Sequence, residues 1–201
     1  MPRRADPRME ERILNTAQEL WQRGGERALT MRAIAEAAGT NTPTIYRRFK
    51  SRRDIEFALV QRVQRDLISA LQPSRSPEEI CTRYVEFAMN HTREYKLLQA
   101  HTGELIASIP PPGRSTTWSS KPIVELIGKQ LAGRLGGSAS QHVRLSLALW
   151  ALAHGTTTLL MSKWITKRNA RELRAAFAAA LDTLTCSRIL ANNDLWLGGS
   201  R

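Results

Sequence analysis

The chain has 201 residues, of which 42% are hydrophobic, and its formal net charge is +12. The hydrophobic content is typical of a globular protein and argues against a disordered chain. Two cysteines, Cys81 and Cys186, are too few for a disulfide scaffold. The first residues lack the apolar stretch of a secretory signal, so the protein is expected in the cytoplasm. The positive excess favours an acidic partner.

Helical periodicity dominates the sequence, and no strand-like alternation persists beyond a few residues, so the fold is expected to be all α. An apolar stripe that begins at Met9 predicts a first helix, which Gly24 and Gly25 end. Thr30 can cap a second helix that closes at Gly39. The predicted turn after it is short, because a further capping residue follows almost at once.

That residue is Asn41, which can cap a short third helix held down by Ile45 and Phe49. Ser51 and Asp54 make a capping-box pair that opens a long fourth helix. This helix is expected to reach the break at residues 73–77, PSRSP. Three short helices followed by a long one, with a glycine turn between the second and the third, are typical of helix-turn-helix organisation.

Longer helices are predicted after the break. Capping-box pairs, Ser138 with Gln141 and Asn169 with Glu172, mark the starts of the last two. Residues 107–120 are too rich in Pro, Ser and Gly to be helical. The expected helices span the apolar stripe from Ile80 to His91, then 95–106, 121–135, 139–165 and 170–190.

One uncharged stretch, residues 145–162, reaches the length at which a membrane helix must be considered. It contains His154, Gly155 and three consecutive threonines, and Arg144 and Lys163 flank it. These features favour a helix surrounded by protein rather than lipid. We therefore expect no membrane segment.

The outer side of the third helix offers hydroxyl and guanidinium groups that can bind base edges and phosphates. Five basic residues without an intervening acid follow within seven positions: Arg47, Arg48, Lys50, Arg52 and Arg53. A solvated basic face is the alternative interpretation of this run.

The segment LTMRAIAEAAGTNTPTIYRRFKSRRDI, residues 29–55, resembles the DNA-binding segment of the TetR family of transcriptional regulators. The family pattern is of the type T-x-x-x-I-A-x-x-A-G-V-S-x-x-x-x-Y-x-x-F-x-x-K-x-x-L. Thr40 and Asn41 replace its Val-Ser, and Arg52 replaces its Lys. The residues that match it are Thr30, Ile34, Ala35, Ala38, Gly39, Tyr46, Phe49 and, with Ile for Leu, Ile55.

The resemblance implies a helix-turn-helix domain over residues 1–54 that binds a double-stranded DNA operator. The residues expected to touch phosphates are Thr30, Arg32, Tyr46, Arg48 and Arg52, with Lys50 in the same basic run; those expected to face bases are Thr42, Pro43, Thr44 and Arg47. The alternative is that the Thr and Pro residues only start a helix.

Residues 55–201 are expected to form a C-terminal helical domain for ligand binding and dimerisation. The helix from residue 139 has two apolar stripes, one through Leu145 and Leu149 and another through Leu147 and Trp150. One buried face would need fewer apolar residues, so a homodimer is preferred over a monomer in which every apolar residue is core. The last helix carries small residues that permit close helix approach: Ala175, Ala176, Ala178, Ala179 and Ala180.

The resemblance also implies a small-molecule effector that weakens DNA binding. Aromatic walls and a few polar handles are what such a pocket requires. The candidates are Tyr84, Phe87, His91, Trp118, Trp150 and His154, each of which could instead be plain core.

The four histidines show no paired metal spacing, and no HExxH, GxSxG, P-loop or dinucleotide motif is present, so no catalysis, metal or cofactor is expected. The expected function is a repressor released from a palindromic operator by a small molecule. The alternatives are a helical scaffold and a constitutive DNA-binding protein without an effector.

Overall fold

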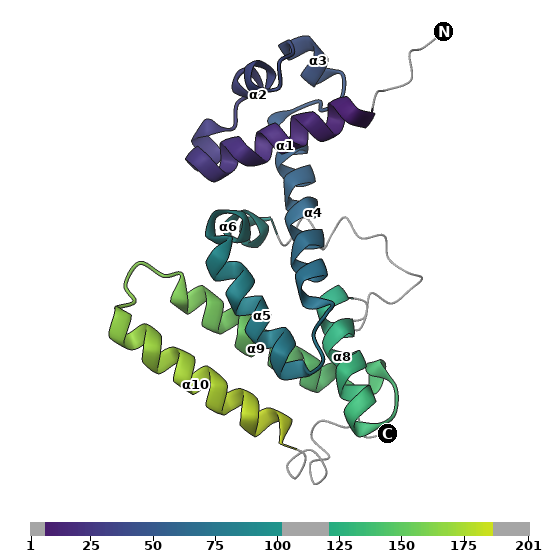
Figure 1. The fold of residues 1–201 in the computed structure, drawn as a ribbon, viewed down its shortest axis with the longest axis vertical. Helices are drawn as coiled ribbons and strands as arrows, with labels where there is room; N and C mark the ends of the chain where they lie inside the picture. The colour runs from purple at the N-terminus through teal and green to yellow at the C-terminus, as the bar shows by residue number, and fades with distance from the viewer. Residues whose placement is uncertain (1–6, 102–120, 187–201) are drawn as a thin grey trace. The chain divides into compact units, whose positions relative to one another are not determined.

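The computed structural model describes residues 7–101 and 121–186, and every regular element in these ranges is a helix, which confirms the all-α expectation. Figure 1 shows the elements in order: α1 (Pro7–Gly24), η1 (Gly25–Ala28), α2 (Met31–Ala37), α3 (Thr42–Tyr46), α4 (Arg52–Leu71), α5 (Pro77–Asn90), α6 (Thr92–Ala100), α8 (Pro122–Leu135), η3 (Ala139–His142), α9 (Val143–Leu160) and α10 (Lys167–Thr185).

The described residues form two compact units. Unit 1 contains residues 7–65 and 91–101, and unit 2 contains residues 66–90 and 121–186. Most of α4 therefore packs with unit 1, and so does α6, although the chain between them belongs to unit 2. The functional boundary between residues 54 and 55 stays a prediction.

Unit 1 has a small apolar core to which each of its first helices contributes. Ile13 of α1, Ile34 of α2, Ile45 of α3 and Ile55 of α4 are completely buried, and Phe49 is 7% exposed. Burying side chains of this size contributes about 1.5–3 kcal/mol each. The short helices α2 and α3 are thus held by tertiary packing rather than by their own helix propensity.

The expected caps are present in unit 1. The Thr30 hydroxyl accepts from the backbone amide of Ala33 at 3.1 Å, and Asn41 Oδ1 accepts from that of Thr44 at 3.0 Å. Asp54 accepts from the backbone amide of Ser51 at 3.2 Å, which completes the capping box at α4. These side chains satisfy amides that the first turn of a helix leaves unpaired.

The predicted starts of two helices are wrong, because a short 3-10 turn precedes one and a different residue caps the other. The Ser138 capping box exists, but it starts η3, and α9 begins only at Val143. Thr166 rather than Asn169 caps α10, because its hydroxyl accepts from the amide of Asn169. The turn η1 was not expected at all.

Helix α9 ends at Leu160, with Met161 as its C-cap, rather than at residue 165. Two further predicted helix ends also need correction. Helix α6 ends at Ala100, with His101 as its C-cap, rather than at Ile106, and α10 ends at Thr185 with Cys186 as its C-cap. The remaining residues of those two predictions, 102–106 and 187–190, lie outside the described residues.

Unit 2 is built around α9, which packs against α5, α8 and α10. Its core-facing side is the first of the two predicted stripes, with Leu145, Leu149 and Leu160 buried. The second stripe, which includes Leu147 and Trp150, is only half-buried. None of the described helices, α9 included, is long and apolar enough to cross a membrane.

Candidate nucleic-acid interface

The turn between α2 and α3 presents the outer side of α3 to solvent. Gly39 makes this turn with a backbone φ of 62°, a value that residues with a side chain rarely adopt. Ile45 faces the core, whereas Tyr46 at the end of this short helix and its C-cap Arg47 are exposed. A helix held from one side with an exposed polar side has the geometry of a recognition helix.

Arg47 lies along α3 because a chain of side-chain hydrogen bonds holds it there. Its Nη2 donates to the Thr44 hydroxyl at 2.9 Å, and that hydroxyl donates to Asn41 Oδ1 at 2.8 Å. The same Asn41 oxygen caps the helix. The guanidinium is thus positioned on an exposed surface before any partner binds.

Tyr46 and Arg48 differ in how far they are accessible. Tyr46 is 52% exposed, so its phenol can reach a partner. Arg48 is half-buried, and its Nη1 atom is buried with no hydrogen-bond partner among the described residues. Such a buried donor costs free energy until it is paired, so Arg48 gains most if an acceptor approaches.

Arg52 has two carboxylate partners, which the sequence did not indicate. Its Nη2 lies 2.9 Å from Oε1 of Glu26 on η1, and its Nε lies 3.0 Å from Oε1 of Glu56. Glu56 follows Arg52 by four residues on α4, so that pair could have been found from helix spacing. Glu26 could not, because its position depends on the unexpected turn η1.

The remaining candidates lie on the same stretch of unit 1. Arg32, Pro43 and Lys50 are exposed, and Thr42 is half-buried in the first turn of α3. Thr30 is exposed, but its hydroxyl already serves as the cap of α2. All ten predicted DNA contacts are therefore within unit 1, between Thr30 and the first residue of α4.

Three of the predicted pocket residues meet in unit 2. Tyr84 is 4% exposed, and its hydroxyl lies 3.1 Å from Nδ1 of His154. The Trp150 ring lies 6.0 Å from that of His154, centre to centre. Burial lowers the pKa of His154, because the imidazolium loses hydration there.

The other three pocket candidates are Phe87, His91 and Trp118. Phe87 is half-buried on α5, and His91 is an exposed N-cap of α6 that belongs to unit 1. Trp118 lies outside the described residues. The role of all six in ligand binding stays a prediction.

The described residues also include thiols and side chains of the metal-ligating types. They contain no group of three or more His, Cys, Asp or Glu side chains that could hold a metal ion. Burial raises the pKa of the Cys81 thiol to about 12. That thiol donates to the carbonyl of Leu149 at 3.7 Å, which is a structural contact of a protonated group.

Two family models match the chain. The model described as bacterial regulatory proteins of the tetR family matches residues 13–59, which include α2, α3 and the start of α4. The model described as the tetracyclin repressor-like C-terminal domain matches residues 78–184, more than half of the chain. No curated protein matches the chain.

Several solved structures share the fold. The protein SCO4313 superposes with a TM-score of 0.61 at 20% identity, over 92% of this chain and 99% of that one. A TetR-like transcriptional regulator from Rhodococcus sp. RHA1 superposes with a TM-score of 0.51 at 23% sequence identity, over 95% of this chain and all of that one. A protein of unknown function from the same organism superposes with a TM-score of 0.56 at 20% sequence identity, over 92% of this chain and 96% of that one. At these identities the likeness shows the fold alone.

Proposed function

Because the chain belongs to the TetR family of bacterial regulatory proteins, we propose that it binds one specific double-stranded DNA operator through α3 and represses transcription there. The observation that carries this proposal is the exposed side of α3, where Arg47 is held in place by Thr44 beside the exposed Tyr46. Positioned guanidinium and hydroxyl groups of this kind hydrogen-bond to base edges and phosphates.

The contacts divide by the depth to which each residue can reach into the major groove. Thr42, Pro43, Thr44 and Arg47, on the first turns of α3 and its C-cap, read bases. A second set flanks them and binds phosphates: Thr30, Arg32, Tyr46, Arg48, Lys50 and Arg52. This division follows from the general rule that phosphate contacts orient a protein whereas base contacts specify the sequence.

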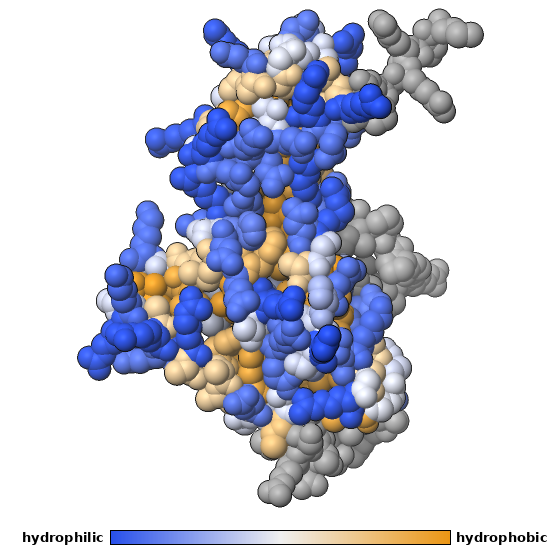
Figure 2. Space-filling model, in the orientation of Figure 1, coloured by the Kyte–Doolittle hydropathy of each residue, from blue (hydrophilic) through white to orange (hydrophobic). Residues whose placement is uncertain are grey.

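The protein acts as a homodimer built on α9 and α10. Ala175, Ala176, Ala178 and Ala179 are exposed along α10, and Figure 2 shows a pale orange apolar patch on the face of unit 2 turned to the viewer. Leu159 is 40% exposed and Trp164 67% exposed at the α9–α10 connection. Exposed apolar surface of this kind supports association of two copies.

A small molecule bound in the C-terminal domain weakens operator binding. The aromatic cluster of Tyr84, Trp150 and His154 supplies apolar walls with two polar groups, which suits a small apolar ligand. Linkage then requires the operator to weaken effector binding by the same factor, typically about 5 to 150-fold.

The test is selection of operators from a random duplex pool with the full-length chain, followed by fluorescence anisotropy on the selected sequence. A dimer with two-fold symmetry should enrich a palindrome whose half-sites lie roughly 34–36 Å or somewhat more apart. Enrichment of no sequence, with binding that depends only on salt, would contradict sequence-specific regulation and favour a non-specific basic scaffold.

The repressor claim has a separate test. A reporter placed behind the selected palindrome should be less active when the protein is expressed, and an effector found by thermal shift should restore it. A ligand that binds with equal affinity to the free and the operator-bound protein would leave a constitutive DNA-binding protein as the function.

A further inference from the structure

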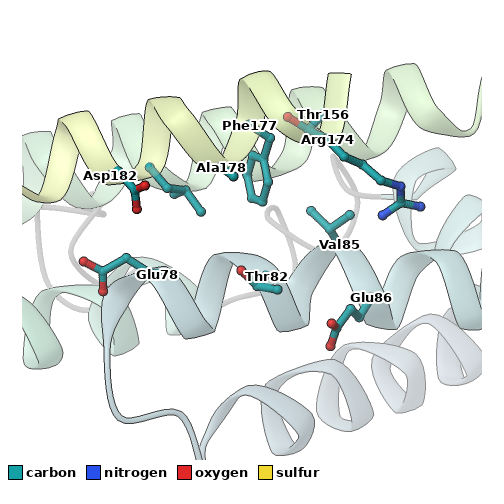
Figure 3. Close-up of a pocket in the computed structure, with 10 residues that line it drawn as sticks. Glu78, Thr82, Val85, Glu86, Thr156, Arg174, Phe177, Ala178 and Asp182 are labelled. Atoms are coloured by element: carbon teal, nitrogen blue, oxygen red, sulfur yellow. The ribbon is translucent and has the colours of Figure 1, made fainter. Parts of the chain in front are cut away.

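A groove of about 300 Å³ lies in unit 2 between α5 and α10, with α9 as its floor. Figure 3 shows that Glu78 of α5 and Asp182 of α10 face each other at one end, whereas Glu86 and Arg174 occupy the other. Each helix places its two charged residues eight positions apart, which corresponds to about 12 Å along a helix. We call this hollow the α5–α10 groove.

The middle of the α5–α10 groove is apolar. Val85 of α5 and Phe177 and Leu181 of α10 line it, and each is less than a tenth exposed. Figure 3 shows the Phe177 ring between α10 and α5, in the space between the two charged ends. An elongated apolar body can therefore lie along the helices, with its own ends at the charged residues.

The charge of the groove is opposite to that of the whole chain. Its lining holds three carboxylates and one guanidinium, a formal −2, in a protein of net charge +12. Arg174 and Glu86 lie at the same end of the groove and their formal charges cancel, so the excess of formal negative charge lies at the end formed by Glu78 and Asp182. Asp182 has no ion-pair or hydrogen-bond partner among the residues that the structure describes.

Glu78 stays ionised in this position. Burial raises its pKa, but hydrogen bonds from Thr185, Ser76 and Arg134 outweigh that effect and bring it down to about 2. Arg134 Nη1 lies 2.7 Å from Oε1 of Glu78 and comes from α8. One positive charge thus holds Glu78 in place, while Asp182 opposite it remains uncompensated.

A threonine hydroxyl on the floor of the groove makes no hydrogen bond within the described residues. Thr156 is 4% exposed and makes no hydrogen bond to any described residue. Its neighbours differ, because Thr157 donates to the carbonyl of Ala153 at 2.8 Å and Thr158 to that of His154 at 3.0 Å. The Thr156 oxygen is not among the fully buried polar atoms that lack a partner, so it is accessible from the groove, where a bound molecule can form a hydrogen bond with it.

We propose that the α5–α10 groove binds an elongated organic cation. Its protonated amine lies between Glu78 and Asp182, its apolar body packs on Val85 and Phe177, and a hydroxyl at its far end pairs with Thr156. Neither the aromatic cluster of Tyr84, Trp150 and His154 nor DNA binding enters this proposal, because it concerns the free protein and a different set of residues.

The first experiment is calorimetric titration of the full-length chain at pH 7 with three matched probes: 4-phenylbutylamine, 4-phenylbutan-1-ol and 4-phenylbutanoate. The amine should bind at least ten-fold more tightly than the alcohol, and the acid should not bind. High salt should weaken the binding of the amine and leave the binding of the alcohol unchanged, because salt screens charges near the surface. Equal affinities for the amine and the alcohol would overturn the proposal.

The second experiment locates the amine. Asp182→Asn should weaken binding of 4-phenylbutylamine about five-fold or more and leave binding of the alcohol unchanged. Glu172→Gln is the matched control, because Glu172 is an exposed carboxylate on the same helix that does not line the groove. Both substitutions are at exposed positions, so the variants should fold. Equal loss in the two variants, or no loss in either, would place the cation elsewhere.

The third experiment tests the role of Thr156. The probe 4-(4-aminobutyl)phenol, which adds a hydroxyl at the end away from the amine, should bind more tightly than 4-phenylbutylamine. Thr156→Val keeps the shape and removes the hydroxyl, so it should abolish this difference without changing the affinity for 4-phenylbutylamine. A difference that persists in Thr156→Val would show that the hydroxyl does not reach Thr156.

Discussion

Arg47 and Lys50 are both exposed cations, yet their surroundings prepare them for different contacts. Arg47 is tied to Thr44 on α3, so its planar donor group has a fixed direction. The Lys50 ammonium has no side-chain partner among the described residues and extends from an exposed position before α4. The oriented guanidinium of Arg47 is suited to hydrogen bonds with a base edge, whereas the unrestrained ammonium of Lys50 is suited to an ionic contact with a phosphate.

We therefore expect Arg47→Ala to lose about 1–3 kcal/mol of operator binding, mainly at one base position. Lys50→Ala should weaken all duplexes alike and lower the salt slope by about 1. Anisotropy titrations against a panel of single-base operator variants at several salt concentrations measure both effects. Identical behaviour of the two variants across the panel would refute the division into base reader and phosphate contact.

Arg52 differs from Lys50 because Glu26 and Glu56 already neutralise part of its charge. Arg52→Ala should still weaken every duplex alike, but its salt slope should fall by less than that of Lys50→Ala. The same titrations decide this. A larger loss of slope in Arg52→Ala would mean that the two ion pairs open when DNA binds.

His154 makes the stability of unit 2 depend on pH. Burial lowers its pKa in the folded state, so between that pKa and the ordinary value of 6.5 the unfolded chain binds more protons. Stability then rises with pH and is lost as the pH falls below about 6.5. Urea unfolding from pH 5 to 8 should show this trend, and His154→Gln should reduce it. An unchanged slope in the variant would assign the dependence to other groups.

At the scale of whole elements, Arg62 of α4 makes polar contacts with α1. Arg62 donates to Glu11 at 2.6 Å, to Asn15 at 2.7 Å and to Gln18 at 3.2 Å. These three residues are spaced by three or four positions, so they lie on one side of α1. The Arg62 side chain is only 12% exposed, whereas that of Glu11 is 65% exposed, so the guanidinium is more shielded from water than its carboxylate partner. This cluster fixes α1 against the helix that follows α3.

Arg62→Ala should lower the free energy of unfolding by about 2 kcal/mol, because hydrogen bonds to a charged group contribute about 1.5–3 kcal/mol. Arg65→Ala is the matched control, since Arg65 is exposed on the same helix, and it should change stability by less than about 0.5 kcal/mol. Urea unfolding followed by circular dichroism compares the two. Equal effects would mean that the contacts of Arg62 with α1 contribute nothing beyond a surface charge.

Helix α6 packs with the DNA-binding end of the chain although it follows the break at residues 73–77. The Trp21 indole donates to the carbonyl of Arg93 at 3.2 Å, and the Gln22 amide donates to Glu94 at 2.7 Å. Glu94 is only 8% exposed. The end of α1 and the first turn of α6 are thus joined by polar contacts within unit 1.

For the whole molecule, the proposed dimer is the property most open to test. Ala176→Arg and Ala179→Arg each place a long charged side chain on the exposed face of α10. At least one of them should convert the dimer to a monomer, because close helix approach leaves no room for it. Ser69→Arg, at an exposed position on α4, is the control and should remain dimeric.

Light scattering at micromolar concentration measures the mass in each case. A monomeric wild-type chain would contradict the dimer itself. A dimer that survives both alanine substitutions would contradict only the choice of face.

The sequence by itself determined the local features of unit 1. Thr30, Asn41 and the Ser51–Asp54 pair were predicted as caps, and Gly39 as the end of α2, because each depends on residues within four positions of one another. Apolar spacing likewise predicted that Ile45 and Phe49 would face the core. The fixed spacing of this segment is also why the family could be named from the sequence.

Tertiary structure alone decided what depends on residues far apart in the chain. Three features have no signature in local spacing: the contact of Arg52 with Glu26, the position of α6 in unit 1, and the placement of Glu78 and Asp182 on opposite sides of the α5–α10 groove. They follow from how helices pack, and packing is set by the fit of whole faces rather than by a short pattern. For the same physical reason the sequence indicated where DNA would bind but not where the groove lies.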